Sequence, residues 1–229
     1  MIKKLTLLMA VSCLLLAGCG KEKETAEIAQ SETSETTEES VLTVKALPDT
    51  TMENLTDATL AVSLEEGDVY IDDTGVLQMD VEIHTYNKYD MVDISMLKEG
   101  DVIEVHPGCI DAHSGEIKID TLERNDRGRV IINGDLEEGG FHLDTDDDGV
   151  YHEEGFDNVK NWYEVGEATL RVSTDFKFYD NSDWDAGEQI FYPGSFLNGE
   201  VTDYDFHPHY TTIRVEDGQV VEMNRRFQP

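Results

Sequence analysis

Three aspartates at alternate positions are the residues of this chain whose spacing most directly suggests chemistry. They are Asp144, Asp146 and Asp148, and Gly149 follows them directly. Carboxylates two residues apart, followed by a glycine turn, can wrap several oxygen ligands around one calcium ion. The run therefore predicts a metal site whose cofactor is calcium.

Over six residues this run resembles the beginning of an EF-hand-type calcium loop. The twelfth position of that pattern carries a bidentate glutamate, whereas this chain has Gly155 there. A neighbouring acid, Glu153, Glu154 or Asp157, would have to replace it, so we expect weak binding. The alternative is an ordinary acidic hairpin turn without a metal, since other turns of the chain also combine Asp or Asn with Gly.

A pair of histidines is the second candidate. His207 and His209 are two residues apart, so on a strand they would face the same side and could chelate one metal ion. Pro208 between them favours an edge strand or a loop, where they would simply be exposed histidines. A metal-dependent envelope hydrolase would use such residues, and this enzyme is the alternative to a binding function.

A thiol and two imidazoles lie within eight residues, at His106, Cys109 and His113. They could ligate zinc, or pair a cysteine nucleophile with a histidine base. The spacing lacks the second cysteine pair of structural zinc sites, and a turn with one buried thiol explains it equally. We interpret Cys109 as a packing residue.

Aromatic residues are concentrated between residues 176 and 210. Aspartates and asparagines lie among them and could hydrogen-bond a sugar that stacks on an exposed ring. The alternative is core packing, because strands favour aromatic residues on packing grounds alone. The residues expected to bind a ligand are Trp184, Tyr192 and Tyr204.

The elements that must position these residues are strands. Polar and apolar residues alternate over residues 76–84, 101–105, 116–120, 129–133, 140–143, 169–173, 175–179, 211–215 and 219–223. Turn sequences with Asp and Gly separate them. This order predicts an all-β fold, an antiparallel sandwich or barrel over residues 41–229, built as one domain or two small subdomains. One short helix is expected near 157–165, with Asp157 as its cap and Gly166 at its end.

The amino-terminal residues indicate where in the cell the protein is located. Two lysines precede an apolar stretch over residues 5–16, which is too short to span a bilayer of ~30 Å, and the stretch ends in Leu16-Ala17-Gly18-Cys19. This ending resembles the lipobox of bacterial lipoproteins. The resemblance implies a signal peptide over residues 1–18, fatty chains such as palmitate on Cys19, and a membrane anchor on the outer face of a bacterial membrane.

Residues 19–40 follow as an acidic tether. Ile28 is the one large apolar residue between residues 20 and 40, so this segment cannot bury enough surface to offset the cost of ordering its backbone. The whole chain has a formal net charge of −33. Such a charge argues against nucleic acid as a partner and is compatible with cations, basic proteins or neutral ligands.

Together these observations predict an extracytoplasmic binding or interaction module rather than an enzyme. Its expected ligands are a divalent cation, a glycan or another envelope protein, and a purely structural envelope component is a further alternative. The sequence contains no His-Glu-x-x-His, no Gly-x-Ser-x-Gly and no phosphate-binding glycine loop.

Overall fold

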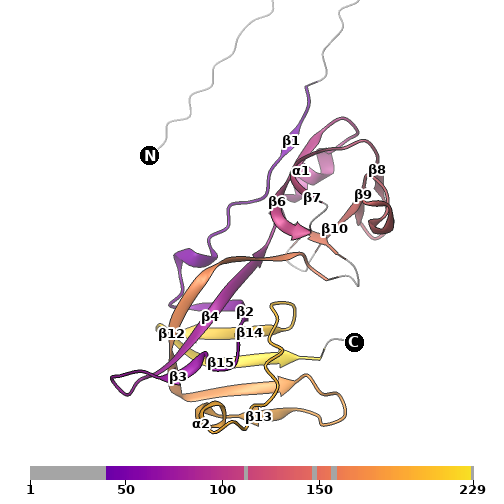
Figure 1. Cartoon of the computed structure of the whole chain (residues 1–229). Coiled ribbons are helices and arrows are strands. Elements are labelled where there is room, and N and C mark those ends of the chain that lie inside the picture. Colours follow the sequence, from indigo (N-terminus) through magenta and orange to yellow (C-terminus); the bar gives the residue numbers. More distant parts are fainter. Residues whose placement is uncertain (1–39, 111–112, 146–148, 156–158, 228–229) are drawn as a thin grey trace, which may run out of the picture. The chain divides into compact units, whose positions relative to one another are not determined.

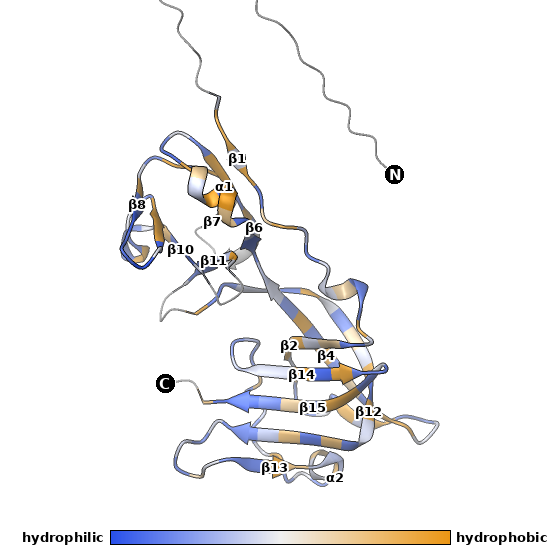
Figure 2. Cartoon of the chain, turned by 180° about the vertical axis from the view of Figure 1, so that it is seen from behind, coloured by the Kyte–Doolittle hydropathy of each residue, from blue (hydrophilic) through white to orange (hydrophobic). Residues whose placement is uncertain are grey.

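Long β-strands with alternating side chains dominate the structure, which is a computed structural model. It describes residues 40–110, 113–145, 149–155 and 159–227 (Figure 1). Figure 2 shows how hydrophilic and hydrophobic residues alternate along the longer strands. The prediction of an all-β fold is confirmed.

The largest sheet has the strand order β13-β12-β15-β14-β2-β4-β3. Its strands are β2 (Ala58–Ser63), β3 (Val69–Ile71), β4 (Leu77–Tyr86), β12 (Trp162–Asn181), β13 (Gln189–Phe191), β14 (Thr211–Glu216) and β15 (Gln219–Arg226). The first half of β12 pairs with β4, and its second half pairs with β15. Because β12 pairs with both β15 and β4, which are not neighbours in the sheet, the sheet curls back on itself.

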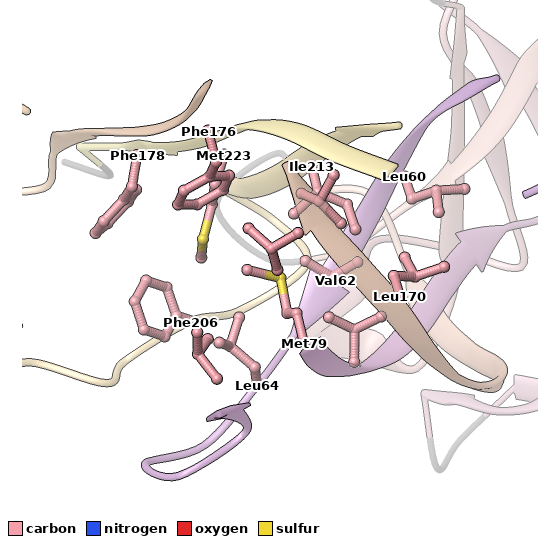
Figure 3. Close-up of a cluster of buried hydrophobic side chains, with 14 of the residues drawn as sticks. Leu60, Val62, Leu64, Met79, Leu170, Phe176, Phe178, Phe206, Ile213 and Met223 are labelled. Carbon is pink, nitrogen blue, oxygen red and sulfur yellow. The ribbon is translucent and has the colours of Figure 1, made fainter. Parts of the chain in front are cut away.

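The alternation along β4 shows how this sheet separates its core from its polar face. Met79, Val81 and Ile83 are buried, whereas Asp80 and Glu82 between them are not. The buried side chains meet others from β2, β12, β14 and β15 and the bridged pair Leu64 and Phe206. Figure 3 shows this cluster, with Leu60, Val62, Leu64, Leu170, Phe176, Phe178, Phe206, Ile213 and Met223 labelled. One face of β4 therefore closes the core, and the other carries carboxylates.

A second buried cluster is built from two smaller sheets and one helix. The first sheet, in the order β5-β11-β10-β9-β8, contains β5 (Lys88–Tyr89), β8 (Leu122–Arg124), β9 (Val130–Ile132), β10 (Phe141–Thr145) and β11 (Tyr151–Glu154). The second, in the order β1-β6-β7, contains β1 (Thr43–Val44), β6 (Val102–Ile110) and β7 (His113–Lys118). Tyr89, Ile103 and Phe141 are fully buried between these elements.

The helix predicted near 157–165 is wrong. Asp157 lies outside the described residues. Strand β12 begins with Trp162 and Tyr163, which pair with Tyr86 and Thr85 of β4. The ring of Trp162 packs edge-on against Tyr86 with the ring centroids 4.8 Å apart, and such cross-strand aromatic pairs stabilise a sheet. Gly166, the expected helix end, lies instead at a register shift of the strand pair.

The described residues contain short helices at other places. These are α1 (Met91–Met96), α2 (Pro193–Leu197) and the 3-10 turns Thr51–Glu53 and Leu136–Glu138. Asp90 caps α1, because its carboxylate accepts hydrogen bonds from the N–H groups of Val92 and Asp93. None of the helices described has the length and apolar character needed to cross a membrane.

Candidate functional site

A pocket of about 870 Å³ lies against the polar face of β2, β4 and β12. Its size falls within the range of ligand sites. Five carboxylates line it, from Glu65, Asp68, Asp80, Glu82 and Glu167, and its lining contains no lysine or arginine. We call it the acidic pocket. The other lining residues are Ser63, Leu64, Val81, His84, Ala168, Thr169, Tyr204, Phe206, His207 and Pro208.

Strand pairing places two of these carboxylates directly opposite one another. Glu82 of β4 faces Glu167 of β12 in the register of the two strands. Two residues away, Thr169 faces Asp80, and its Oγ1 donates a hydrogen bond of 2.6 Å to Asp80 Oδ1. Like charges directly opposite each other destabilise a strand pair. The sheet therefore carries a local repulsion in this pocket.

Ser63 and His84 form a hydrogen-bonded group with Glu82. Ser63 Oγ donates to Glu82 Oε2 at 2.7 Å and lies 2.8 Å from His84 Nε2. Since a hydroxyl has one proton, His84 Nε2 must act as the donor while that proton is given to Glu82. A serine nucleophile needs the opposite arrangement, in which histidine accepts the hydroxyl proton. The contacts hold the Glu82 carboxylate in place and do not activate Ser63.

Burial favours the neutral form of His84 in the acidic pocket. Only 13% of its side chain is exposed, and this burial lowers its pKa below the ordinary value of 6.5. The nearby Glu82 carboxylate opposes the shift, and His207 adds to it. Because burial disfavours the charged form of this imidazole, the five carboxylates contribute most of the charge of the pocket.

An aromatic wall completes the pocket. Phe206 is buried and forms an isolated bridge with Leu64, next to β2. The ring of Tyr204 packs edge-on against Phe206 with a centroid distance of 5.8 Å. Burial raises the pKa of Tyr204, and the negative charge of Glu66 adds to this effect. The pocket thus combines carboxylates with a neutral phenol and an apolar surface.

The three aromatic residues predicted to bind a ligand do not share a site. Tyr204 lines the acidic pocket, and Trp184 lines a separate groove. Tyr192 directly precedes α2 and is 55% exposed, but it lines neither. Other aromatic residues of this region, such as Phe176 and Phe178, belong to the core. Core packing, the alternative to ligand binding, therefore holds for these two.

The predicted histidine pair lies in a turn. The N–H of Tyr210 donates to the carbonyl of His207 at 3.2 Å, so the rule that alternate strand residues share a face does not apply to His209. His207 lines the acidic pocket, with its Nε2 2.8 Å from Asp205 Oδ1. Across the described ranges, no three His, Cys, Asp or Glu side chains are placed to hold a metal ion. Metal binding by this pair stays a prediction.

The predicted calcium site is only partly described. Asp144 lies on β10, where its Oδ2 accepts hydrogen bonds from Nε and Nη2 of Arg129 at 3.0 and 2.8 Å. Arg129 Nη2 also lies 2.5 Å from Glu154, one of the acids considered as a substitute ligand. Asp146 and Asp148 lie outside the described residues. A calcium ion would have to compete with Arg129 for two carboxylates, and the site stays a prediction.

The described side chains do not show whether His106, Cys109 and His113 form the predicted zinc or cysteine–histidine site. His106 stacks on Tyr163 with ring centroids 3.8 Å apart and nearly parallel planes. Cys109 and His113 lie on β6 and β7, and their side chains are not among those described. The lipidation residue Cys19 also lies outside the described residues.

Sequence reasoning missed the carboxylates of the acidic pocket. The signal was present in β4, where Asp80, Glu82 and His84 occupy the polar positions of an alternating strand. Acidic residues on a polar strand face are usually solvated, so this pattern did not distinguish a site. Glu167 and Ser63 join it only through the pairing of β12 and β2 with β4.

No family model, no curated protein and no solved structure matches this chain. Its function must therefore be inferred from the geometry and charge of its own residues.

Proposed function

We propose that this chain is a lipid-anchored binding module outside a bacterial membrane, and that its acidic pocket binds an elongated organic cation with several ammonium groups. The lipobox-like sequence ending at Cys19 supports the location. The single observation that carries the ligand class is the like-charge pair of Glu82 and Glu167, directly opposite each other in the pocket wall.

The like-charge pair points to a cation because the two facing carboxylates destabilise the strand pair when no cation is bound. Opposite like charges destabilise strand pairs by ~0.2–1 kcal/mol. Three further carboxylates, from Glu65, Asp68 and Asp80, line the same pocket without a lysine or arginine. A bound cation would relieve this repulsion, so its binding energy would include the energy stored in the wall.

The distribution of the carboxylates favours an elongated ligand over a metal ion. Neighbouring strands lie ~4.8 Å apart, and alternate residues of one strand are ~6.8 Å apart. Asp80, Glu82 and Glu167 occupy such positions, and no group of three described side chains is placed around one ion. Ammonium groups separated by three- or four-carbon linkers have comparable spacings. Linear polyamines are therefore the ligand class that fits.

The aromatic wall suits the rest of such a ligand. The methylene linkers of a polyamine are apolar and can pack against the half-buried ring of Tyr204, while an ammonium group gains a cation–π contact with the face of that ring. A metal-dependent hydrolase remains the alternative class. The hydrogen bonds among Ser63, Glu82 and His84 support the binding function, since they position a carboxylate.

Calorimetric titration of the complete detergent-solubilised chain with spermine tests the proposal. We expect saturable binding that weakens strongly between 50 and 500 mM salt, because screening reduces charge–charge attraction. A Lys-rich peptide of equal charge is the comparison, and it should bind more weakly because its ammonium groups lie at the ends of separate flexible side chains that must each be ordered. Equal binding of both would indicate attraction to the acidic tether, and absence of spermine binding would contradict the proposal.

A further inference from the structure

The side chain of Trp184 is displayed to solvent on an ordered turn. It is 79% exposed and lies between β12 and β13, where Asp183 Oδ1 accepts hydrogen bonds from the N–H groups of Asp185 (2.9 Å) and Ala186 (3.2 Å). Exposing a large aromatic ring forgoes the free energy of burying it. The turn thus presents a hydrophobic ring to solvent without burying it.

A second exposed ring lies beside Trp184. Phe227 directly follows β15 and is 44% exposed. The parallel pairing of β12 with β15 places Asn181 opposite Arg226, which brings both rings to the same end of the sheet. The ring centroids are 6.0 Å apart and the planes are inclined by 53°. Because the rings are tilted, they do not cover each other and together form an aromatic surface.

This surface forms one side of a groove of about 800 Å³. The polar residues that line it include Asp183, Asp185, Asp203, Asp205, Tyr210 and Arg226. We call it the aromatic groove. It shares no lining residue with the acidic pocket, so the two sites can be tested separately.

Buried Arg225 fixes the polar wall of the aromatic groove. Its side chain is 2% exposed, and its Nη1 donates to the carbonyl of Asp203 at 3.1 Å and lies 3.2 Å from the Asp203 carboxylate. Its Nε and Nη2 donate to the two carboxylate oxygens of Asp180 at 3.0 and 2.5 Å. The guanidinium also lies over the ring of Phe206. The wall is therefore organised before any ligand binds.

We propose that the aromatic groove binds an uncharged carbohydrate chain, with one sugar ring stacked on Trp184. The C–H face of a pyranose is apolar and matches an aromatic ring, while its hydroxyl groups both donate and accept hydrogen bonds. The groove offers partners for both roles of a sugar hydroxyl, since its aspartate carboxylates can accept hydrogen bonds and the Arg226 guanidinium can donate them.

Charge selects against the other polymers that an exposed tryptophan could bind. An anionic polysaccharide would meet four aspartates of the groove and a chain of net charge −33. A cationic peptide would meet the positive charge of Arg226 within the groove. A neutral polyhydroxyl ligand meets neither penalty.

Intrinsic fluorescence tests this site directly, because the chain has two tryptophans. In the complete chain carrying Trp162→Phe, all tryptophan emission comes from Trp184. We expect at least one of cellotetraose, chitotetraose, maltotetraose and a neutral β-1,3-glucan oligomer to change this emission along a saturable curve. The same oligosaccharide should give a calorimetric dissociation constant at least tenfold higher for Trp184→Ala and changed less than twofold for Trp162→Phe.

Two control variants show whether sugar binding is confined to the aromatic groove. Glu82→Gln, in the acidic pocket, should leave oligosaccharide binding unchanged, and spermine binding should survive Trp184→Ala. Because Trp184 is exposed, its alanine variant is expected to keep the wild-type circular dichroism. No emission change with any of the four sugars, equal affinity of Trp184→Ala, or an emission change produced by tetralysine and not by sugars would overturn the proposal.

Discussion

Glu82 and Glu167 lie directly opposite each other on the neighbouring strands β4 and β12, on the face of the sheet that does not close the core. Substituting either carboxylate by an amide removes the repulsion and keeps the side-chain size. We predict that Glu167→Gln raises the free energy of unfolding by a few tenths of a kcal/mol. Urea denaturation should show this gain at 20 mM salt and a smaller gain at 500 mM.

The matched control for this variant is Glu123→Gln. Glu123 is an exposed residue of β8, so its substitution changes the net charge equally without touching the acidic pocket. Equal gains in both variants would mean that the general negative charge, and not the facing pair, opposes folding.

Arg225 is predicted to be the most sensitive charged position of the large sheet. Burial alone would raise the pKa of Asp180, but hydrogen bonds from Arg225 hold it below its ordinary value. Arg225→Met leaves this buried carboxylate without its partner and should cost ~3–5 kcal/mol in urea denaturation at pH 7. Arg226→Met, at the exposed neighbour, should stay within ~0.5 kcal/mol. Similar losses in both variants would contradict the structural role of the buried pair.

His84 makes stability depend on pH in a defined direction. Its pKa is lower in the folded protein than the ordinary value of 6.5, chiefly because of burial. The unfolded chain therefore binds the proton more readily, so the contribution of this residue is complete above pH 6.5 and is lost as the pH falls below it. Between pH 7.5 and 5.5, His84→Gln should lose less stability than the wild type. Exposed His106→Gln, outside the acidic pocket, is the control, and an equal loss in all three proteins would refute this origin.

The calcium prediction concerns the acidic run that contains Asp146. Thermal unfolding in millimolar calcium should occur a few degrees higher than in chelator, since binding at ten times the dissociation constant contributes ~1.4 kcal/mol. Asp146→Ala should abolish the shift. Identical curves for the wild type would identify this run as an ordinary acidic turn.

The anchor prediction concerns Cys19. The wild-type chain should partition into the detergent phase, whereas Cys19→Ala should yield an unlipidated form that does not. Deletion of residues 1–40 should leave a soluble folded domain, because residues 40–229 form a compact unit with their own buried clusters. Aggregation of the deleted form would show that the tether contributes to folding.

The sequence predicted the strands more reliably than their partners. Alternation in β4 correctly separates buried Met79 and Val81 from Asp80 and Glu82, because this pattern depends only on neighbouring residues. The pairing of β12 with β4 depends on contacts distant in sequence, so Glu167 could not be placed opposite Glu82 in advance. The same reason explains the wrong helix, since the packing of Trp162 against Tyr86 lies across strands and has no local signal.

The most direct test of the proposed function is spermine binding by the double variant Glu82→Gln/Glu167→Gln. Its control is Glu123→Gln/Glu137→Gln, which changes the net charge equally at two positions outside the acidic pocket. Calorimetry of the complete chains at 50 mM salt should show at least a roughly tenfold loss of affinity in the pocket variant, equal to ~1.4 kcal/mol, and less than a twofold loss in the control. Equal losses in the two variants, or full affinity in the pocket variant, would contradict the assignment of the acidic pocket as the ligand site.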